Sequence, residues 1–301
     1  MDVPAAVVEE RALVLGAARS LTGIMTVPAG EAIDPSRPAL IILNAGLVHR
    51  VGPNRLHVLI ARRLAERGFV SVRFDFSGLG ESLPRSDRLP YAQSTVLEVG
   101  EVMDAVTALT GIRGFCLMGL SSGALVSLET ALADRRVVGA AIVNPHGFAE
   151  LPEWVAHVEN LSESRTYARN LLDPHRWWRL LTGKTNYRRL AETFWYRIVR
   201  RNRKGAGISA VLHRMRPKLT AFLALDVGIL LLFSEKDRGM VNFDQILGRR
   251  WQRKLRRNVA VVVLPEANHT FAAPVALEQA VASIERWMIH GWGRSSGTGV
   301  A

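Results

Sequence analysis

The chain has 301 residues, of which 48% are hydrophobic and 22% charged, so it can bury a sizeable core as one large globular domain with an insertion. No run of 18 apolar residues is present and the only cysteine is Cys116, which excludes an obvious membrane span and an internal disulfide. The net charge is +12, and residues 151–218 hold 15 Lys and Arg against 5 Asp and Glu, so the basic excess lies mostly in one segment.

The first part of the chain predicts alternating strands and helices. Two short apolar runs within residues 11–28 predict an antiparallel pair at the edge of a sheet. Residues 39–43 are apolar throughout, as expected of a strand that is covered on both faces. A helix is predicted to begin at Pro53 and to end at Gly68, and residues 69–76 predict the next strand.

A glycine-rich turn follows this strand. Asp75, Gly78, Gly80 and Ser82 form the pattern D-x-x-G-x-G-x-S. Its simplest interpretation is a tight turn without a catalytic role. Residues 93–109 then predict a helix, because valines recur near one face. Strands that alternate with helices predict a parallel sheet with right-handed crossovers.

The stretch 115–125 predicts a short strand, a sharp turn that carries Ser121, and the start of a helix. The turn matches G-x-S-x-G, in which Gly119 and Gly123 leave room for a close strand-to-helix turn. A serine hydroxyl is a weak nucleophile, and such a turn projects it to where a base can reach it. The NH of Ser122, at the helix start, can stabilise an oxyanion there. By itself the pentapeptide is weak evidence, because a plain strand–helix turn gives the same match.

Apolar runs typical of buried strands recur after this turn, at residues 137–143, 227–234 and 259–264. Helical patterns lie at residues 124–133, at a basic stretch through Trp251 and Leu255, and at 274–289. One segment breaks the alternation, because residues 148–222 are helix-like, basic and rich in tryptophan. The predicted organisation is a core of residues 1–147 and 223–292, a helical basic cap of residues 148–222, and a disordered tail of residues 293–301.

Two further strand ends carry the residues that a hydrolytic serine needs. A base must take the serine proton, and a carboxylate must orient the base. One strand releases Asp237 into a loop, and the last strand does the same for His269. Glu235 competes with Asp237 for the acid role, but it lies closer to its strand. An isolated loop histidine is more often structural, whereas three roles at three strand ends, in the order Ser, acid, His, argue against coincidence.

These patterns resemble the α/β-hydrolase superfamily over residues 12–290. The likeness is carried by the two glycine-rich turns and by the order Ser121, Asp237, His269. Within the superfamily the chain looks most like bacterial serine-aminopeptidase-type (S33-type) hydrolases, including those near the exosortase-associated hydrolases. The resemblance implies an α/β-hydrolase fold, with a mostly parallel central sheet, helices on both faces and a helical cap insertion. It also implies that the turn after Asp75 shapes the floor of the site and supports the turn at Ser121.

Residues 44–50 depart from the His-Gly pair that the family commonly carries after its third strand. Backbone donors survive a changed side chain. We therefore expect a backbone NH of Gly46 or Leu47 to complete the oxyanion hole with that of Ser122.

Four further side chains are candidates for binding substrate. His49 and Arg50 suit a carboxylate or phosphate, with salt links to the cap as an equal alternative. Trp177 and Trp178 suit an apolar pocket in the cap, with plain packing onto the core as an almost equal alternative. A cap of this composition favours a substrate with an apolar acyl part and an anionic head.

The leading interpretation is an esterase-like or lipase-like serine hydrolase that cleaves a carboxylic ester, with a thioester or an amide as alternatives, through an acyl-enzyme. An acyltransferase would use the same residues, and a non-catalytic ligand-binding protein on the same fold is the alternative from another class. The expected partner is a small acyl substrate. No motif indicates a cofactor, a metal or a nucleic acid, and the basic segment is either a solvated face or a weak contact with an anionic membrane surface. The N-terminal residues lack the features of a secretory signal, which with the single cysteine favours the cytoplasm.

Overall fold

The computed structural model of the chain describes residues 8–146 and 205–291, apart from positions 31 and 88. The chain divides into two compact units. The first comprises Met1–Gly147, Ala221–Gly239 and Arg253–Ala301, and the second comprises Phe148–Thr220 and Met240–Gln252. The second unit thus includes a short segment after residue 239 that we expected in the core. That residues 148–222 form a cap stays a prediction.

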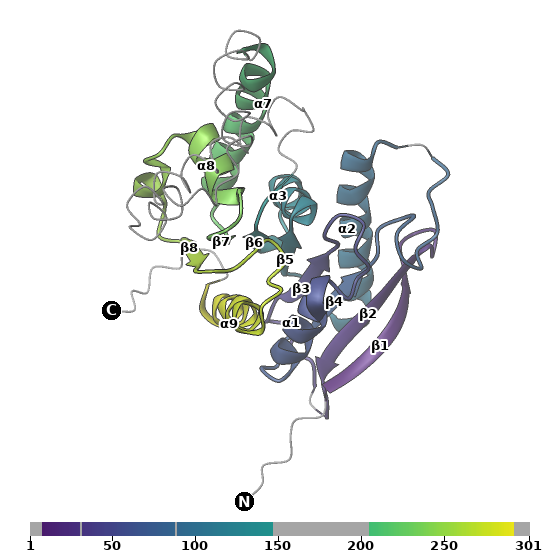
Figure 1. Cartoon of the computed structure of the whole chain (residues 1–301). Helices are drawn as coiled ribbons and strands as arrows, with labels where there is room; N and C mark the ends of the chain where they lie inside the picture. Colours follow the sequence, from purple (N-terminus) through teal and green to yellow (C-terminus); the bar gives the residue numbers. More distant parts are fainter. Residues whose placement is uncertain (1–7, 31, 88, 147–204, 292–301) are drawn as a thin grey trace, which may run out of the picture. The chain divides into compact units, whose positions relative to one another are not determined.

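An eight-stranded sheet runs through the first unit (Figure 1). Its strands are β1 Val8–Leu15, β2 Leu21–Pro28, β3 Ala39–Leu43, β4 Ser71–Phe74, β5 Phe115–Leu120, β6 Val137–Val143, β7 Gly228–Ser234 and β8 Val259–Leu264. They lie in the order β1-β2-β4-β3-β5-β6-β7-β8. β2 is antiparallel to both of its neighbours, and every pair from β4 to β8 is parallel. The predicted antiparallel pair at one edge and the mostly parallel sheet are both confirmed.

The helices connect these strands and follow them. The described ones are η1 Pro53–Arg55, α1 Leu56–Ala65, α2 Tyr91–Thr110, α3 Ser122–Ala133, α7 Gly205–Leu223, α8 Gly239–Leu247, η2 Trp251–Lys254 and α9 Pro274–His290. The single basic helix predicted through Trp251 and Leu255 is wrong, since α8 ends at Leu247 and a 3-10 turn follows. The cause is a local turn, in which the Trp251 indole packs on Phe243 and donates to Asp244 Oδ1 at 2.9 Å.

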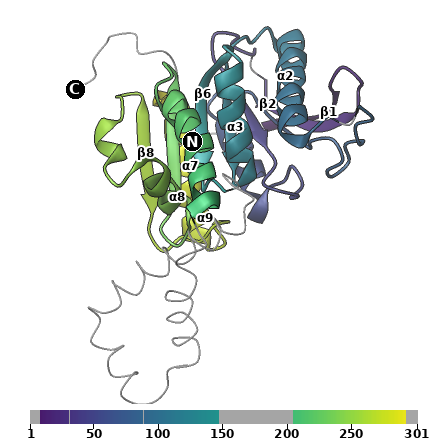
Figure 2. The ribbon, with the colours of Figure 1, turned by 90° about the horizontal axis from the view of Figure 1, so that it is seen from above.

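Helices cover both faces of the sheet (Figures 1 and 2). α1 packs with α9 on one face, and α2 packs with α3 on the other. Alternate residues of the central strands, such as Leu40 and Ile42 of β3, share one buried cluster with α1 and α9. β3, β5 and β7 are buried at every position, which explains why their sequences are continuously apolar. In the described part of the chain, no helix has the length and apolar character needed to cross a membrane.

The register of the parallel strands places their carboxyl ends together. Leu120 of β5 lies opposite Val143 of β6, and Val143 lies opposite Leu232 of β7. β7 and β8 likewise end together, with Ser234 opposite Leu264. The loops after β5, β6, β7 and β8 therefore meet at one edge of the sheet, where open α/β sheets bind ligands.

Candidate active site

Ser121 occupies a strained turn between β5 and α3. Its backbone has φ 62° and ψ −117°, a conformation that side chains other than glycine rarely adopt. Two of its backbone hydrogen bonds tie it to β6 and to the loop after β6. The Ser121 NH donates to Val143 O at 3.0 Å, and the Ser121 carbonyl accepts from the NH of His146 at 3.2 Å. The strain is thus fixed by β6 and the loop after it, as expected of a turn that presents a nucleophile.

The two glycines of the turn are both required by close backbone approach. A Cβ on Gly119 would lie 2.0 Å from the carbonyl oxygen of Gly123, and one on Gly123 would lie 2.5 Å from that of Asn44. Neither contact can be relieved by a side-chain rotation, because the colliding atoms belong to the backbone. The motif therefore reflects the tight packing of the start of α3 against the ends of β5 and β3.

Asp237 and His269 form a hydrogen-bonded pair. His269 Nδ1 lies 2.7 Å from Asp237 Oδ2, and Asp237 Oδ1 accepts the NH of Gly239 at 2.8 Å. The Asp237 side chain is only 4% exposed. Burial alone would raise the pKa of Asp237, but the hydrogen bonds from His146 and His269 outweigh it and hold the pKa below its usual range. Since an ionised carboxylate only accepts, His269 carries its proton on Nδ1 and keeps Nε2 as the basic nitrogen.

A buried amide anchors the loop that carries His269. Asn144, at the end of β6, donates from Nδ2 to Ser234 Oγ at 2.8 Å and to the His269 carbonyl at 2.9 Å. The Asn144 Oδ1 accepts the NH of Ser234 at 2.7 Å, and the Ser234 hydroxyl donates to Asn268 O at 2.8 Å. These bonds join the ends of β6 and β7 to the histidine loop. They explain why a serine, Ser234, stands three positions before Asp237.

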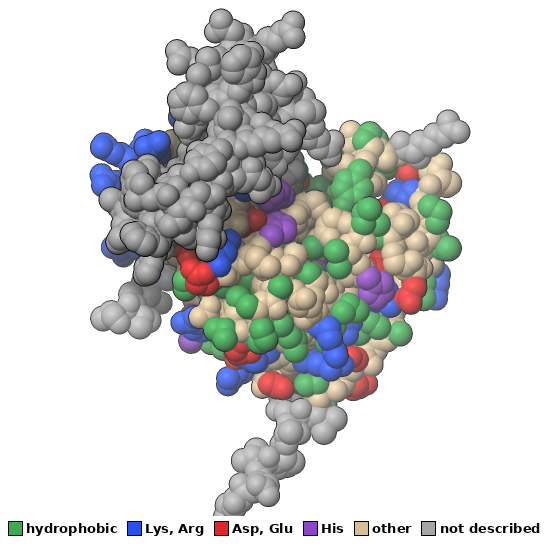
Figure 3. All heavy atoms as spheres, viewed as in Figure 1, with side chains coloured by type: hydrophobic (Ala, Val, Ile, Leu, Met, Phe, Trp, Pro, Cys, Tyr) green, Lys and Arg blue, Asp and Glu red, His purple; other side chains and the backbone are tan. Residues whose placement is uncertain are grey.

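His146 is a residue of this site that the sequence did not single out. Its Nε2 lies 3.5 Å from Asp237 Oδ2, and its ring meets that of His269 edge to face, with centroids 4.6 Å apart and an interplanar angle of 71°. The side chains of both histidines are about one-third exposed, and histidines reach the surface of the face drawn in Figure 3. The signal that could have found it is its place at the carboxyl end of the strand next to β5.

The predicted oxyanion donors lie partly where expected. The Gly46 NH donates to the Ser122 hydroxyl at 2.9 Å, so the loop after β3 reaches the turn but that NH already has an acceptor. The side chain of Leu47 is 88% exposed. Within the described residues no hydrogen bond joins the Ser121 hydroxyl to His269. The oxyanion hole and the complete triad therefore stay predictions, and catalytic hydrogen bonds often tighten only when substrate is bound.

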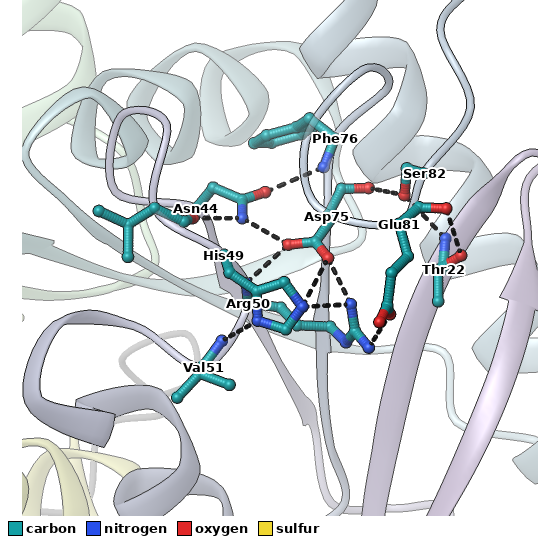
Figure 4. Close-up of polar contacts among 10 residues, drawn as sticks. Thr22, Asn44, His49, Arg50, Val51, Asp75, Phe76, Glu81 and Ser82 are labelled. Carbon is teal, nitrogen blue, oxygen red and sulfur yellow. Dashed lines mark hydrogen bonds and ion pairs between the residues drawn. The ribbon is translucent and has the colours of Figure 1, made fainter.

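A second polar cluster lies after β3 and β4 (Figure 4) and gives Arg50 another role than the one expected. Arg50 is 8% exposed, its NH donates to Asp75 Oδ1 at 2.6 Å, and its guanidinium pairs with Asp75 and Glu81. Burial alone would lower the pKa of Arg50, but these acceptors outweigh it and raise the pKa. A substrate anion would have to displace two carboxylates, so the expectation of an anion-binding Arg50 is corrected. His49, whose Nε2 lies 2.7 Å from Arg50 Nη1, is 39% exposed and stays a candidate.

Asn44 begins the stretch after β3 that departs from the family's common His-Gly pair, and its contacts lie in the same polar cluster. The Asn44 side chain donates to Asp75 Oδ1 at 2.9 Å and accepts the NH of Phe76 at 2.9 Å (Figure 4). The Ser82 hydroxyl donates to the Asp75 carbonyl at 2.6 Å and accepts the NH of Thr22 at 2.8 Å. The glycine-rich turn after Asp75 is therefore tied to β2 and to the loop after β3.

Two groups of side chains in the described residues have donor atoms close enough for a metal ion, namely His146, Asp237 and His269, and His49, Asp75 and Glu81. In the first group a cation would have to replace the proton that joins the imidazole to the carboxylate. In the second group the Arg50 guanidinium already pairs with both carboxylates. Both groups are accounted for by hydrogen bonds and ion pairs. Trp177 and Trp178 lie outside the described residues, and their role stays a prediction.

A model of the alpha/beta hydrolase family matches residues 45–284, which is most of the chain and includes Ser121, Asp237 and His269. The chain belongs to the alpha/beta hydrolase family. The chain is 33% identical to the uncharacterized protein YcjY of Escherichia coli over 88 residues, 28% of each chain. It is 34% identical over 111 residues to RutD of Klebsiella pneumoniae, whose name proposes a carbamate hydrolase. The match covers 36% of this chain and 38% of RutD. The chain thus matches well under half of the length of each of these two relatives.

Solved structures of other hydrolases share its fold. Est1E of Butyrivibrio proteoclasticus has a TM-score of 0.56 at 16% identity, with 93% of this chain and 98% of Est1E covered. Proline iminopeptidase of Mycobacterium smegmatis has a TM-score of 0.54 at 20% identity, with 94% and 98% covered. At these identities the likeness shows the fold alone. The finer likeness to serine-aminopeptidase-type and exosortase-associated hydrolases stays a prediction.

Proposed function

We propose that this alpha/beta hydrolase is a serine hydrolase that cleaves carboxylic esters through an acyl-enzyme on Ser121. The observation that carries the proposal is the 2.7 Å hydrogen bond between His269 and the buried Asp237, at the same sheet edge as the strained turn of Ser121. This combination supplies a nucleophile, a base and an orienting carboxylate in the order typical of the fold.

The proposed reaction has two halves. The Ser121 hydroxyl oxygen attacks the ester carbonyl carbon while its proton passes to His269 Nε2, and the tetrahedral intermediate expels an alkoxide that takes that proton. A water molecule then attacks the acyl-enzyme, again losing a proton to Nε2, and that proton returns to the Ser121 oxygen as the carboxylic acid leaves. Asp237 stays ionised throughout, because its role is to hold the Nδ1 proton and to stabilise the imidazolium.

The developing oxyanion needs two NH donors beside the nucleophile. The NH of Ser122 is the first donor, since it opens α3, where the free NH groups of a helix gather. Gly46 or Leu47 supplies the second. If the second donor is Gly46, its NH must leave the Ser122 hydroxyl and donate to the oxyanion instead. In that case the Ser122 hydroxyl holds the loop after β3 close to the site until substrate binds.

Related reactions on the same residues differ in the molecule that accepts the acyl group and in the acyl group itself. Acyl transfer uses the same residues and differs only in the molecule that enters in the second half, so water and an alcohol have to be compared as acceptors. Because RutD is named for carbamate hydrolysis, a carbamate belongs beside the esters in a substrate panel. A ligand-binding protein without activity would bind members of the panel and turn none over.

The test is hydrolysis of p-nitrophenyl esters of increasing chain length and of a p-nitrophenyl carbamate, by the wild type and by Ser121→Ala. We expect ester hydrolysis by the wild type and a loss on the order of 10⁶ in kcat in the variant. Ser122→Ala is the comparison variant, which removes the neighbouring hydroxyl, and with it the acceptor of the Gly46 NH, but no nucleophile. Equal activity of Ser121→Ala and wild type, with loss in Ser122→Ala, would overturn the proposal.

A further inference from the structure

His146 contacts each of the three residues of the proposed mechanism. Its NH donates to the Ser121 carbonyl at 3.2 Å, its Nε2 lies 3.5 Å from Asp237 Oδ2, and its ring rests edge to face on that of His269. We infer that His146 is a positioning residue of the active site, which holds the carboxylate of Asp237 and the ring of His269 in their productive orientation. The inference rests on the proposed function.

The carboxylate of Asp237 gives the first argument. Its Oδ1 is held by the Gly239 NH, while its Oδ2 faces both His269 Nδ1 and His146 Nε2. With the side chain only 4% exposed, water cannot readily replace a lost donor. The two imidazoles approach Oδ2 from different elements, the loop after β6 and the loop after β8. With both donors in place the carboxylate has little freedom to turn about its last torsion.

The contact between the two rings gives the second argument. An interplanar angle of 71° and a centroid distance of 4.6 Å mean that the edge of one ring meets the face of the other. The His146 ring therefore limits how far the His269 ring can tilt away from Asp237. Small errors in this orientation matter, since catalytic groups must be held within about 0.5 Å of their productive geometry.

The side chain of His146 can be tested separately from its backbone. Its backbone bond to Ser121 survives any side-chain substitution except proline, so a side-chain variant tests the imidazole alone. In the described part of the chain, the titratable side chains in contact with it are those of Asp237 and His269. Since Asp237 only accepts, His146 donates from Nε2.

Three variants separate the contributions of donor and ring. His146→Phe keeps an aromatic ring without a donor, His146→Gln keeps an amide donor, and His290→Phe is a control at an exposed position at the end of α9. For a p-nitrophenyl ester we expect His146→Phe to lower kcat about 10- to 100-fold, the range found for residues that orient a functional ligand. KM should change little, His146→Gln should recover most of kcat, and the control should match the wild type.

A second measurement does not depend on turnover. The hydrogen-bonded Nδ1 proton of His269 should give a downfield ¹H NMR signal in the Ser121→Ala background, absent from Ser121→Ala/His269→Gln. His146→Phe should broaden or shift this signal, and His146→Gln should largely restore it. If the wild type hydrolyses no ester but these spectral changes occur, the proposed function fails and the positioning role stands.

Three outcomes would overturn the inference. The first is that His146→Phe matches the wild type in kcat and in the spectrum. The second is that His146→Gln is as impaired as His146→Phe, which would assign His146 to packing. The third is that only KM changes, which would make His146 a substrate contact. Should His146→Phe fail to fold, His146→Leu takes its place as the variant without a donor, and wild-type kcat and spectrum in His146→Leu would overturn the inference.

Discussion

Asp237 is a carboxylate held ionised in an almost fully buried position. Burial opposes its charge, and the donors His146 and His269 overcome that opposition, so its pKa lies below its usual range. A carboxyl whose pKa is depressed on folding stabilises the folded state above its unfolded pKa, about 3.9 for Asp, and loses this contribution as the pH falls further. At neutral pH it is therefore a permanent negative charge beside His269.

Replacing this charge by an amide should be far more damaging than a change at the nearby Glu235. Asp237→Asn favours the wrong imidazole tautomer, and we expect kcat for an ester to fall about 10⁴-fold with KM nearly unchanged. Glu235→Gln is the control, because it makes the same carboxylate-to-amide change two positions away, on a side chain that accepts the NH of Glu266 at 3.1 Å. The measurement is the steady-state kcat of the two variants. If both retained the wild-type kcat, Asp237 would have no part in the mechanism.

Arg50 should prove structural rather than substrate-binding. Arg50→Leu leaves Asp75, which is 0% exposed, without its cation, and we expect the free energy of unfolding to fall by about 3 to 5 kcal/mol in urea titrations. The double variant Arg50→Leu/Asp75→Asn, which removes both charges, should recover part of that loss. An unchanged stability with a raised KM for anionic esters would restore the original expectation.

At this scale the sequence predicted the residues that motifs and strand ends mark, and missed those defined by contacts across the fold. Ser121 is marked by its glycines, and Asp237 and His269 by the apolar runs before them. Arg50 was expected to bind a substrate anion or to form salt links to the cap, because the partners it has lie 25 and 31 positions away in the chain. His146 was missed because its significance comes from lying beside Asp237, which is set by the register of β6 and β7.

The turn from β5 to α3 can form only because Gly119 has no Cβ atom. The backbone of Gly123 leaves no space for a side chain on Gly119, where a Cβ would lie 2.0 Å from an oxygen. We expect Gly119→Ala to lower the free energy of unfolding by more than about 4 kcal/mol, in the range of the most damaging substitutions. Gly114→Ala is the matched control just before β5, since its Cβ would meet ordinary contacts at 3.6 Å or more. Similar melting temperatures for both variants would contradict this account.

Helix α1 carries a buried histidine that should make stability depend on pH. His57 is completely buried, neither ring nitrogen has a hydrogen-bond partner within the described residues, and burial lowers its pKa to about 4. Because its unfolded pKa is about 6.5, the unfolded state binds the proton more readily, and stability is full above that pH and lost as the pH falls towards 4.

Urea unfolding at pH 7 and pH 5 tests this. We expect the wild type to lose about 2 kcal/mol of unfolding free energy from His57 between these values. His57→Leu, which is similar in size and does not titrate, should lose correspondingly less, and His290→Leu at an exposed position should behave as the wild type. Equal pH dependence of His57→Leu and wild type would contradict the buried neutral state.

At the scale of the whole molecule, alternating apolar runs and helical patterns were sufficient to predict the sheet, because strands buried on both faces have continuous apolar sequences. The break between α8 and η2 could not be predicted, since it depends on Trp251 turning back onto Phe243. Many basic side chains of the first unit have acidic partners, such as Arg63 with Glu278 and Arg67 with Glu285, and both signs of charge occur on the face in Figure 3. The unbalanced positive charge lies mainly in the segment 151–218.

The most direct test of the central claim is covalent labelling by a fluorophosphonate, followed by mass spectrometry of the peptides. A fluorophosphonate phosphonylates only an activated serine, so we predict a single adduct on the peptide that spans residues 114–135, located on Ser121 by fragmentation and absent from Ser121→Ala. Asp237→Asn should slow the labelling, and Ser122→Ala should leave the adduct on Ser121. An adduct on Ser122 or on another serine, or no labelling of the folded wild type, would contradict the account.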